Sequence, residues 1–228
     1  MKIVQPTYIC KQPSTGKNVE FRPFTNKEEK SLLLALQEED IYTIAATIKN
    51  IISVCTDGKV NPLKVPYYDV EYLFMKIRAK SVGEIIDLEG GCGCGTEKKT
   101  EFSVNIDDTV VEPKPVKNPT IKIGGTPYSI ILQHPNLDAI VESIEKDSEQ
   151  ATKTVASCIV SIFTDDEVLD WSEEETLEFV ESMTTIQQKD IAKFIQEMPS
   201  VKLPTVYKCK ACGTTHESVL TGFRNFFL

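Results

Sequence analysis

The spacing of hydrophobic residues changes from the period of strands to the period of helices within the first 90 residues. Residues 8–11 and 18–22 have strand-like composition, and segment 12–17 between them is rich in turn-forming residues. This pattern predicts an N-terminal β-hairpin. Hydrophobic residues then recur three or four positions apart, as on one face of an amphipathic helix, which predicts three successive helices at residues 25–36, 41–55 and 69–83.

Two later segments resemble each other, because each reads as a hairpin with two cysteines at its tip. The first tip holds Cys92 and Cys94 within a run of glycines, and the second holds Cys209 and Cys212. Alternating strand-forming residues on both sides of each tip predict strands. We expect these strands at residues 84–88 and 100–106 for the first hairpin and 205–208 and 217–220 for the second.

The middle of the chain is expected to be mainly helical. Residues 111–119 include three prolines and predict an extended connection that marks an internal boundary. A hairpin is expected after it, at residues 121–123 and 128–132. The helices are then expected at residues 136–145, 151–163, from the capping box at Ser172 onward, and 185–198.

These elements together predict an α+β fold. It has an N-terminal β-hairpin with helices, a central helical region, and two cysteine-tipped β-hairpins that form a zinc-ribbon-like site. We expect three regions: an N-terminal α+β region with the first cysteine hairpin at 1–110, a β-hairpin plus helical region at 111–200, and a C-terminal cysteine hairpin with an aromatic tail at 201–228 that packs with the first region.

Composition and charge narrow the classes of function. With 228 residues and 41% hydrophobic residues, the chain can bury a substantial core. No apolar run approaches the roughly 18 to 20 residues of a membrane span, and the N-terminus lacks the apolar core of a signal peptide. We therefore expect no membrane association and a cytoplasmic location. The net charge of −9 disfavours nucleic acid as a partner, because binding to phosphates requires clustered Lys and Arg.

The cysteines carry the main chemical signal. There are seven, an odd number, and no secretory signal accompanies them, which disfavours a disulfide framework. A structural zinc ion takes four ligands in a tetrahedron, and the Cys209-x-x-Cys212 turn supplies two of them. The tip with Cys92 and Cys94 supplies the complement, so the sequence predicts a structural Zn²⁺ site made of all four cysteines.

Three alternatives to that site remain open at this point. The Cys92-x-Cys94 spacing is shorter than the usual Cys-x-x-Cys, so one of these two cysteines could bind together with His216. Reduced cysteines without metal, or an occasional disulfide, are a second alternative. A thioredoxin-like redox role is a weaker third one, since that motif begins a helix and Cys212 is followed by turn residues.

Other residues give little indication of catalysis. Four cysteines leave no open coordination position for a catalytic zinc, and no nucleotide-binding or serine-hydrolase motif occurs. His134 precedes Pro135 and is expected in a loop as a surface or hydrogen-bonded residue. Cys10, Cys55 and Cys158 are expected to be small buried apolar residues. We therefore expect no enzyme and no small-molecule substrate.

The C-terminal segment 222–228 contains three phenylalanines and a leucine. Such a segment is costly to expose to water. We expect it to fold back beside the second cysteine hairpin, and docking into a partner is the alternative.

Several short motifs follow one another in a specific order along the chain: segments 13–17, 21–24, 27–30, 69–74 and 78–84, the Cys209-x-x-Cys212 turn, Gly222 and segment 225–227. Their order resembles the T4-type bacteriophage baseplate protein family, whose members are baseplate hub subunits or hub assembly proteins. The resemblance is strongest over residues 7–89 and 195–228. This chain departs from the family at Cys92-Gly-Cys94, where members typically have Cys-x-x-Cys.

The resemblance implies a structural or assembly role in the baseplate hub of a contractile phage tail, without catalysis. It implies other baseplate or tail hub proteins as partners. It also implies a location in the host cytoplasm during assembly, and in the tail baseplate if the protein stays in the virion. A zinc-ribbon adaptor that binds nucleic acid or a host protein is the alternative function.

Overall fold

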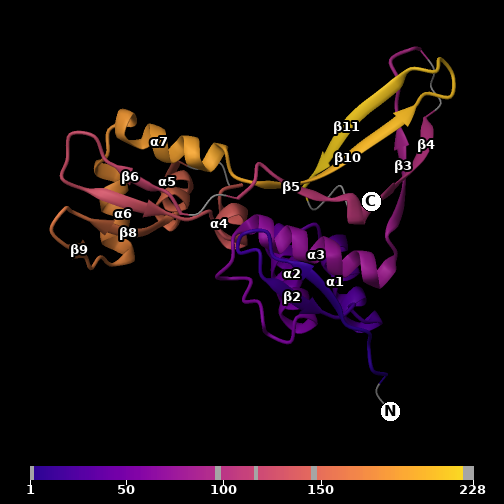
Figure 1. The fold of residues 1–228 in the computed structure, drawn as a ribbon, viewed down its shortest axis with the longest axis horizontal. Helices are drawn as coiled ribbons and strands as arrows, with labels where there is room; N and C mark the ends of the chain where they lie inside the picture. The colour runs from indigo at the N-terminus through magenta and orange to yellow at the C-terminus, as the bar shows by residue number, and fades with distance from the viewer. Residues whose placement is uncertain (1–2, 96–98, 116–117, 145–147, 223–228) are drawn as a thin grey trace.

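The fold is mixed α+β, as predicted, and its hydrophobic residues gather into three clusters. The computed structural model describes residues 3–95, 99–115, 118–144 and 148–222. Figure 1 shows the N-terminal helices below two long hairpins, with the central region as a separate lobe at the left. The predicted C-terminal aromatic tail, residues 223–228, lies outside the described residues.

The N-terminal hairpin and its three helices form the first cluster. Thr25 and Glu28 form a capping box at the start of α1, and Asp40 caps α2 by accepting a hydrogen bond from the Thr43 backbone N–H. The isoleucine-rich face of α2 packs against α3, and Ile48, Ile51 and Ile52 are almost fully buried. These elements are β1 (Tyr8–Lys11), β2 (Asn18–Phe21), α1 (Asn26–Glu38), α2 (Ile41–Cys55) and α3 (Tyr67–Val82).

Helix α3 begins two residues before its predicted start at Asp69. Pro66 occupies the N-cap position, where its fixed φ suits entry into a helix. The Asp69 side chain is fully buried, and it accepts hydrogen bonds from the Ser14 backbone N–H (2.9 Å) and from Gln12 Nε2 (2.6 Å). These bonds hold the turn of the N-terminal hairpin against the first turn of α3.

The opposite side of α3 contributes to the second cluster. Met75 and Ala79 pack there against Ile106 and against Val201 and Leu203 of β10. Strand β10 was predicted only from residue 205, but it begins five residues earlier. Its first residues alternate inward and outward and pair with β5, a strand that overlaps the start of the segment predicted to be an extended connection. The elements are β3 (Ile85–Gly90), β4 (Thr100–Asn105), β5 (Val110–Glu112), β10 (Ser200–Lys208), β11 (Thr215–Thr221) and a 3-10 turn at Ile106–Asp108.

The central lobe is a four-stranded antiparallel sheet, in the order β6-β7-β8-β9, with helices packed against it. The capping box predicted at Ser172 is present. The elements are β6 (Thr120–Lys122), β7 (Ser129–Leu132), α4 (Leu137–Glu142), α5 (Ser148–Ser157), β8 (Ile159–Phe163), β9 (Val168–Leu169), α6 (Glu173–Ser182) and α7 (Thr185–Gln196).

The prediction of one helix over residues 151–163 is wrong. The helix ends at Ser157, and residues 159–163 form β8, which lies between β7 and β9 in the sheet. Ile159, Ile162 and Phe163 are β-branched or aromatic, and they pair with β7 across the sheet. Pairing with a distant strand therefore overrides the local helical spacing. No helix in the described parts of the chain is both long enough and apolar enough to cross a membrane.

Glu71 of α3 gives the fold a specific pH dependence. Its side chain is 1% exposed, and burial raises its pKa to about 7, although the backbone N–H groups of Val201 and Gly222 donate to it and lower the pKa. The folded protein therefore binds a proton here that the unfolded chain loses near pH 4.5. Ionising Glu71 costs stability, so its unfavourable contribution grows as the pH rises from about 4.5 through 7.

We predict that the difference in free energy of unfolding between Glu71→Gln and the unmodified protein shifts in favour of the variant by about 3 kcal/mol as the pH rises from 4.5 to 8. Urea unfolding at each pH measures this difference. The control is Glu20→Gln, because Lys59 lowers the pKa of the exposed Glu20 carboxyl below this pH range, so the stability of that variant relative to the unmodified protein should stay nearly constant over it. A difference for Glu71→Gln that stays constant over this range would contradict the prediction.

Candidate metal centre

The two cysteine-tipped hairpins meet at their tips. Strand β3 ends at Gly90, and the chain then reaches Cys92 and Cys94. Strand β10 ends at Lys208 and is followed directly by Cys209 and Cys212. In Figure 1 the two hairpins extend together away from the helices, so their tips lie side by side. Residues more than 110 positions apart are thereby brought into contact.

The four predicted cysteines form one compact group. Their Sγ atoms all lie within 4.8 Å of one another. The Cys92 and Cys212 sulfurs are 3.6 Å apart, and the Cys94 and Cys209 sulfurs are 3.9 Å apart. A disulfide would require about 2.05 Å. The edge of a tetrahedron of thiolates, each about 2.3 Å from a metal ion, is about 3.8 Å. The spacing therefore suits a tetrahedral metal site and excludes disulfides in this state.

The turn after β10 prepares its two thiols to bind as thiolates. Backbone N–H groups of Cys212 and Ala211 donate to the Cys209 sulfur and lower its pKa. The Thr214 hydroxyl and backbone N–H, with smaller contributions from the Cys92 and Cys209 side chains, lower the pKa of Cys212 to about 6. Gly213 has φ +75°, which closes the turn through a 2.9 Å bond from its N–H to the Cys209 carbonyl. This turn therefore favours the charged form that metals bind.

The environment of Cys92 has the opposite effect. The Cys94 backbone N–H lowers the pKa of Cys92, but desolvation and the neighbouring sulfurs of Cys212, Cys94 and Cys209 outweigh it and raise the pKa to about 12. Negative charges so close together repel each other, and a bound cation is what would relieve that repulsion.

Tyr207 fixes how the two hairpins approach each other. Its ring stacks on Phe102 of β4, with centroids 4.6 Å apart, and its hydroxyl donates to the Gly91 carbonyl at 2.5 Å. The ring also lies against Gly90, where an added Cβ would come within 2.3 Å of it. The sequence analysis missed this contact. The only sign of this contact in the sequence was an aromatic residue, Tyr207, two positions before Cys209.

The structure separates the remaining candidate residues from the four cysteines. His216 lies outside the group and stacks on the other side of Tyr207, with centroids 5.0 Å apart. Cys55 and Cys158 are buried, as expected, while Cys10 is half-buried. Burial raises the pKa of each of these three thiols to about 11, so none of them is prepared to bind a metal as a thiolate.

His134 corrects another expectation. It was expected on the surface or hydrogen-bonded, but it is 7% exposed, and neither ring nitrogen has a hydrogen-bond partner within the described structure. Its ring stacks on Phe194 at 4.3 Å, and burial lowers its pKa to about 4. A ring that is inserted between two parts of the fold cannot be recognised from neighbouring residues in the sequence.

The fold and the four-cysteine site by themselves define a class of protein. The chain is an α+β protein in which four cysteines, from two hairpins distant in sequence, form a candidate metal site of the structural kind. The comparison with known sequences agrees with the motifs noted above. The chain belongs to the T4 bacteriophage base plate protein family, which matches residues 5–228.

A curated relative supports this membership. The chain is 26% identical over 216 residues to the baseplate hub assembly protein gp26 of Enterobacteria phage T4, and the match covers 93% of each chain. No solved structure matches the chain.

The contact between Gly90 and Tyr207 yields a prediction with an adjacent control. Gly90→Ala would push the Tyr207 ring away and separate the two cysteine tips. We expect affinity for a divalent metal to fall by about tenfold or more, as is typical when the residues that support metal ligands are changed. Gly91→Ala is the control, because a Cβ at Gly91 meets nothing within 4 Å. Equal metal affinities for the two variants, measured by competition with a chromophoric chelator, would contradict the proposed docking.

Proposed function

We propose that this protein acts in the hub of a contractile phage tail baseplate, as a structural component or an assembly factor, through contacts with other hub proteins. The observation that carries the proposal is the family match from residue 5 to the last residue, together with the full-length similarity to a hub assembly protein.

We further propose that the four cysteines hold one structural zinc ion. Four thiolates are the ligand set of closed structural zinc sites, and the sulfur separations of 3.6 and 3.9 Å fit such a tetrahedron. A closed site leaves no position for a water or a substrate, so the zinc would stabilise the fold without catalysis. The ion would join Cys94 to Cys209 across 115 positions of the chain, and closing so long a loop restricts the unfolded state strongly.

The zinc proposal predicts a definite metal content. The purified protein should contain one zinc per chain, and replacing Cys92, Cys94, Cys209 or Cys212 by Ser should remove or weaken it. The loss should lower the free energy of unfolding by several kcal/mol, since binding of a structural zinc contributes directly to folding. Zinc should also be released as the pH falls, because protons compete for the thiolates. Cys10→Ser is the matched control and should keep its zinc.

Elemental analysis and urea unfolding measure both effects. A protein without zinc, or zinc content that does not respond to changes at Cys92 and Cys94, would contradict the two-hairpin site. Retention of zinc only when His216 is intact would instead support the ligand set with one cysteine missing.

The hub proposal predicts the consequence of removing the protein. A phage that encodes this chain but carries a stop codon early in its gene should accumulate baseplate intermediates without a complete hub, and supplying the chain in trans should restore infectivity. Mass spectrometry of purified tails then separates two roles. The chain in tails indicates a structural subunit, and the chain only in the infected-cell lysate indicates an assembly factor. Normal tails formed without the protein would contradict the proposal.

A further inference from the structure

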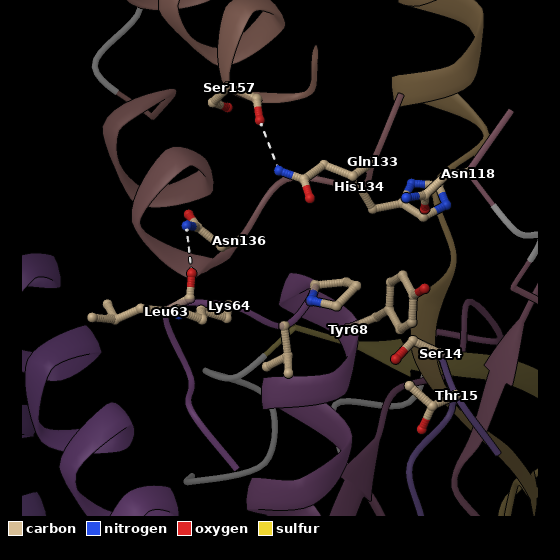
Figure 2. A pocket seen from close by; sticks show the side chains of 12 residues that line it. Ser14, Thr15, Leu63, Lys64, Tyr68, Asn118, Gln133, His134, Asn136 and Ser157 are labelled. Carbon is tan, nitrogen blue, oxygen red and sulfur yellow. Dashed lines mark hydrogen bonds between the residues drawn. The ribbon is translucent and has the colours of Figure 1, made fainter. Parts of the chain in front are cut away.

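A cleft of about 830 Å³ lies where the N-terminal part of the fold meets the central lobe. Figure 2 shows its walls, which come from segments far apart in sequence. One wall is the turn after β1, with Ser14 and Thr15, and the segment that leads into α3. The other wall is the connection from β7 to α4, with Gln133 and His134. Its volume is in the range of sites that bind ligands.

Hydrogen bonds between the two walls fix the shape of the cleft. The Tyr67 backbone N–H donates to the Pro135 carbonyl at 2.9 Å, and Asn136 Nδ2 donates to the Leu63 carbonyl at 3.1 Å. Within one wall, Gln133 Nε2 donates to the Ser157 carbonyl at 3.3 Å. Figure 2 draws the last two of these bonds as dashed lines. A cleft held in this way exists before any partner binds, which lowers the ordering cost of binding.

The polar groups that line the cleft suit a peptide backbone. The carboxamides of Asn118 and Gln133 can both donate and accept hydrogen bonds, whereas the Ser14 and Thr15 hydroxyls already donate to Asp69 and Gln12 and can only accept from a ligand. A peptide backbone offers the same mixture, one N–H and one C=O per residue. Lys64 is a cation in the lining, and no aspartate or glutamate is among the described residues that line the cleft, although the chain as a whole carries a net charge of −9. The cleft is therefore a place where a carboxylate can approach this acidic protein.

His134 provides a second, independent observation at the cleft. Its ring lines the cleft and is 93% buried, yet both nitrogens lack a hydrogen-bond partner within the described structure. Packing alone does not explain a histidine here, because a phenylalanine would stack on Phe194 and Tyr68 equally well without leaving polar atoms unpaired. A neutral imidazole has one donor nitrogen and one acceptor nitrogen on different edges of the ring, so a peptide C=O can pair with the first or a peptide N–H with the second.

We propose that this cleft binds an extended segment of a partner hub protein. The carboxamides of Asn118 and Gln133 pair with the backbone of the segment, one of its peptide groups bonds to one nitrogen of His134 after a small shift of the ring, and Lys64 pairs with a carboxylate. The carboxylate comes from an acidic side chain or from the C-terminus of the partner. The identity of the partner rests on the proposed hub function, and the peptide chemistry rests on the cleft alone.

Synthetic 15-residue peptides that tile the hub proteins of the same phage test this proposal directly. Binding to the full-length protein is measured by fluorescence anisotropy. We expect at least one peptide to bind, and binding to weaken tenfold or more in His134→Phe and in Lys64→Glu. His134→Phe should melt at the same temperature as the unmodified protein or higher, which shows that lost binding is not lost folding. Lys30→Glu, on an exposed face of α1 outside the cleft, is the charge-matched control and should bind normally.

The outcomes separate this proposal from the proposed function. Weaker binding of a C-terminally amidated peptide assigns the carboxylate to the C-terminus of the partner, and equal binding assigns it to an acidic side chain. Intact hub proteins that bind the unmodified protein and both cleft variants equally would overturn the cleft proposal and leave the hub function standing. Absence of binding by every peptide would also overturn the cleft proposal. A His134→Phe variant that is more stable and binds unchanged would overturn it too, because His134 would then have no part in binding.

Discussion

The arrangement of the β3–β4 and β10–β11 hairpins depends on the contact between their two cysteine tips. Four sulfurs within 4.8 Å of one another cannot all be ionised there without a cation, because the charges would repel each other. The stacking of Tyr207 on Phe102 aligns the hairpins, but an aromatic pair contributes only about 0.5–1.5 kcal/mol beyond the area it buries. We therefore propose that a bound metal closes the tips, with the aromatic contact setting the angle at which they meet.

Strand β10 connects this contact with the core. Val201 and Leu203 at its start are fully buried against α3, and Cys209 follows its last residue. Helix α3 in turn packs against α2 on another face and carries Tyr68 at the wall of the cleft. One hairpin and one helix thus link the candidate metal site, two hydrophobic clusters and the cleft. This arrangement suits a protein that presents fixed surfaces to its neighbours.

The sequence was most informative where structure is local. The N-terminal hairpin, the first three helices, the capping box at Ser172 and the pairing of two cysteine hairpins all follow from spacing and turn chemistry, and all are present. The failures come from contacts over long distances in the chain. Residues 159–163 had helical spacing but pair with β7, and β10 was predicted short because its partner β5 lies about 90 positions away.

The cleft is not visible in the sequence for the same reason. His134 becomes buried only because Phe194 and Tyr68, from two separate helices, close around it. Likewise, the two cysteine pairs were recognisable, but the aromatic contact that docks them was not, since Phe102 and Tyr207 are brought together only by the folded hairpins.

X-ray absorption at the zinc edge of the purified, unmodified protein tests the central claim most directly, because it reports the atoms bound to the metal in solution. The account predicts four sulfur neighbours at about 2.3 Å and no nitrogen or oxygen in the coordination shell. A shell that mixes sulfur with nitrogen or oxygen, or a protein that contains no zinc, would contradict the claim that four cysteines close the two hairpins.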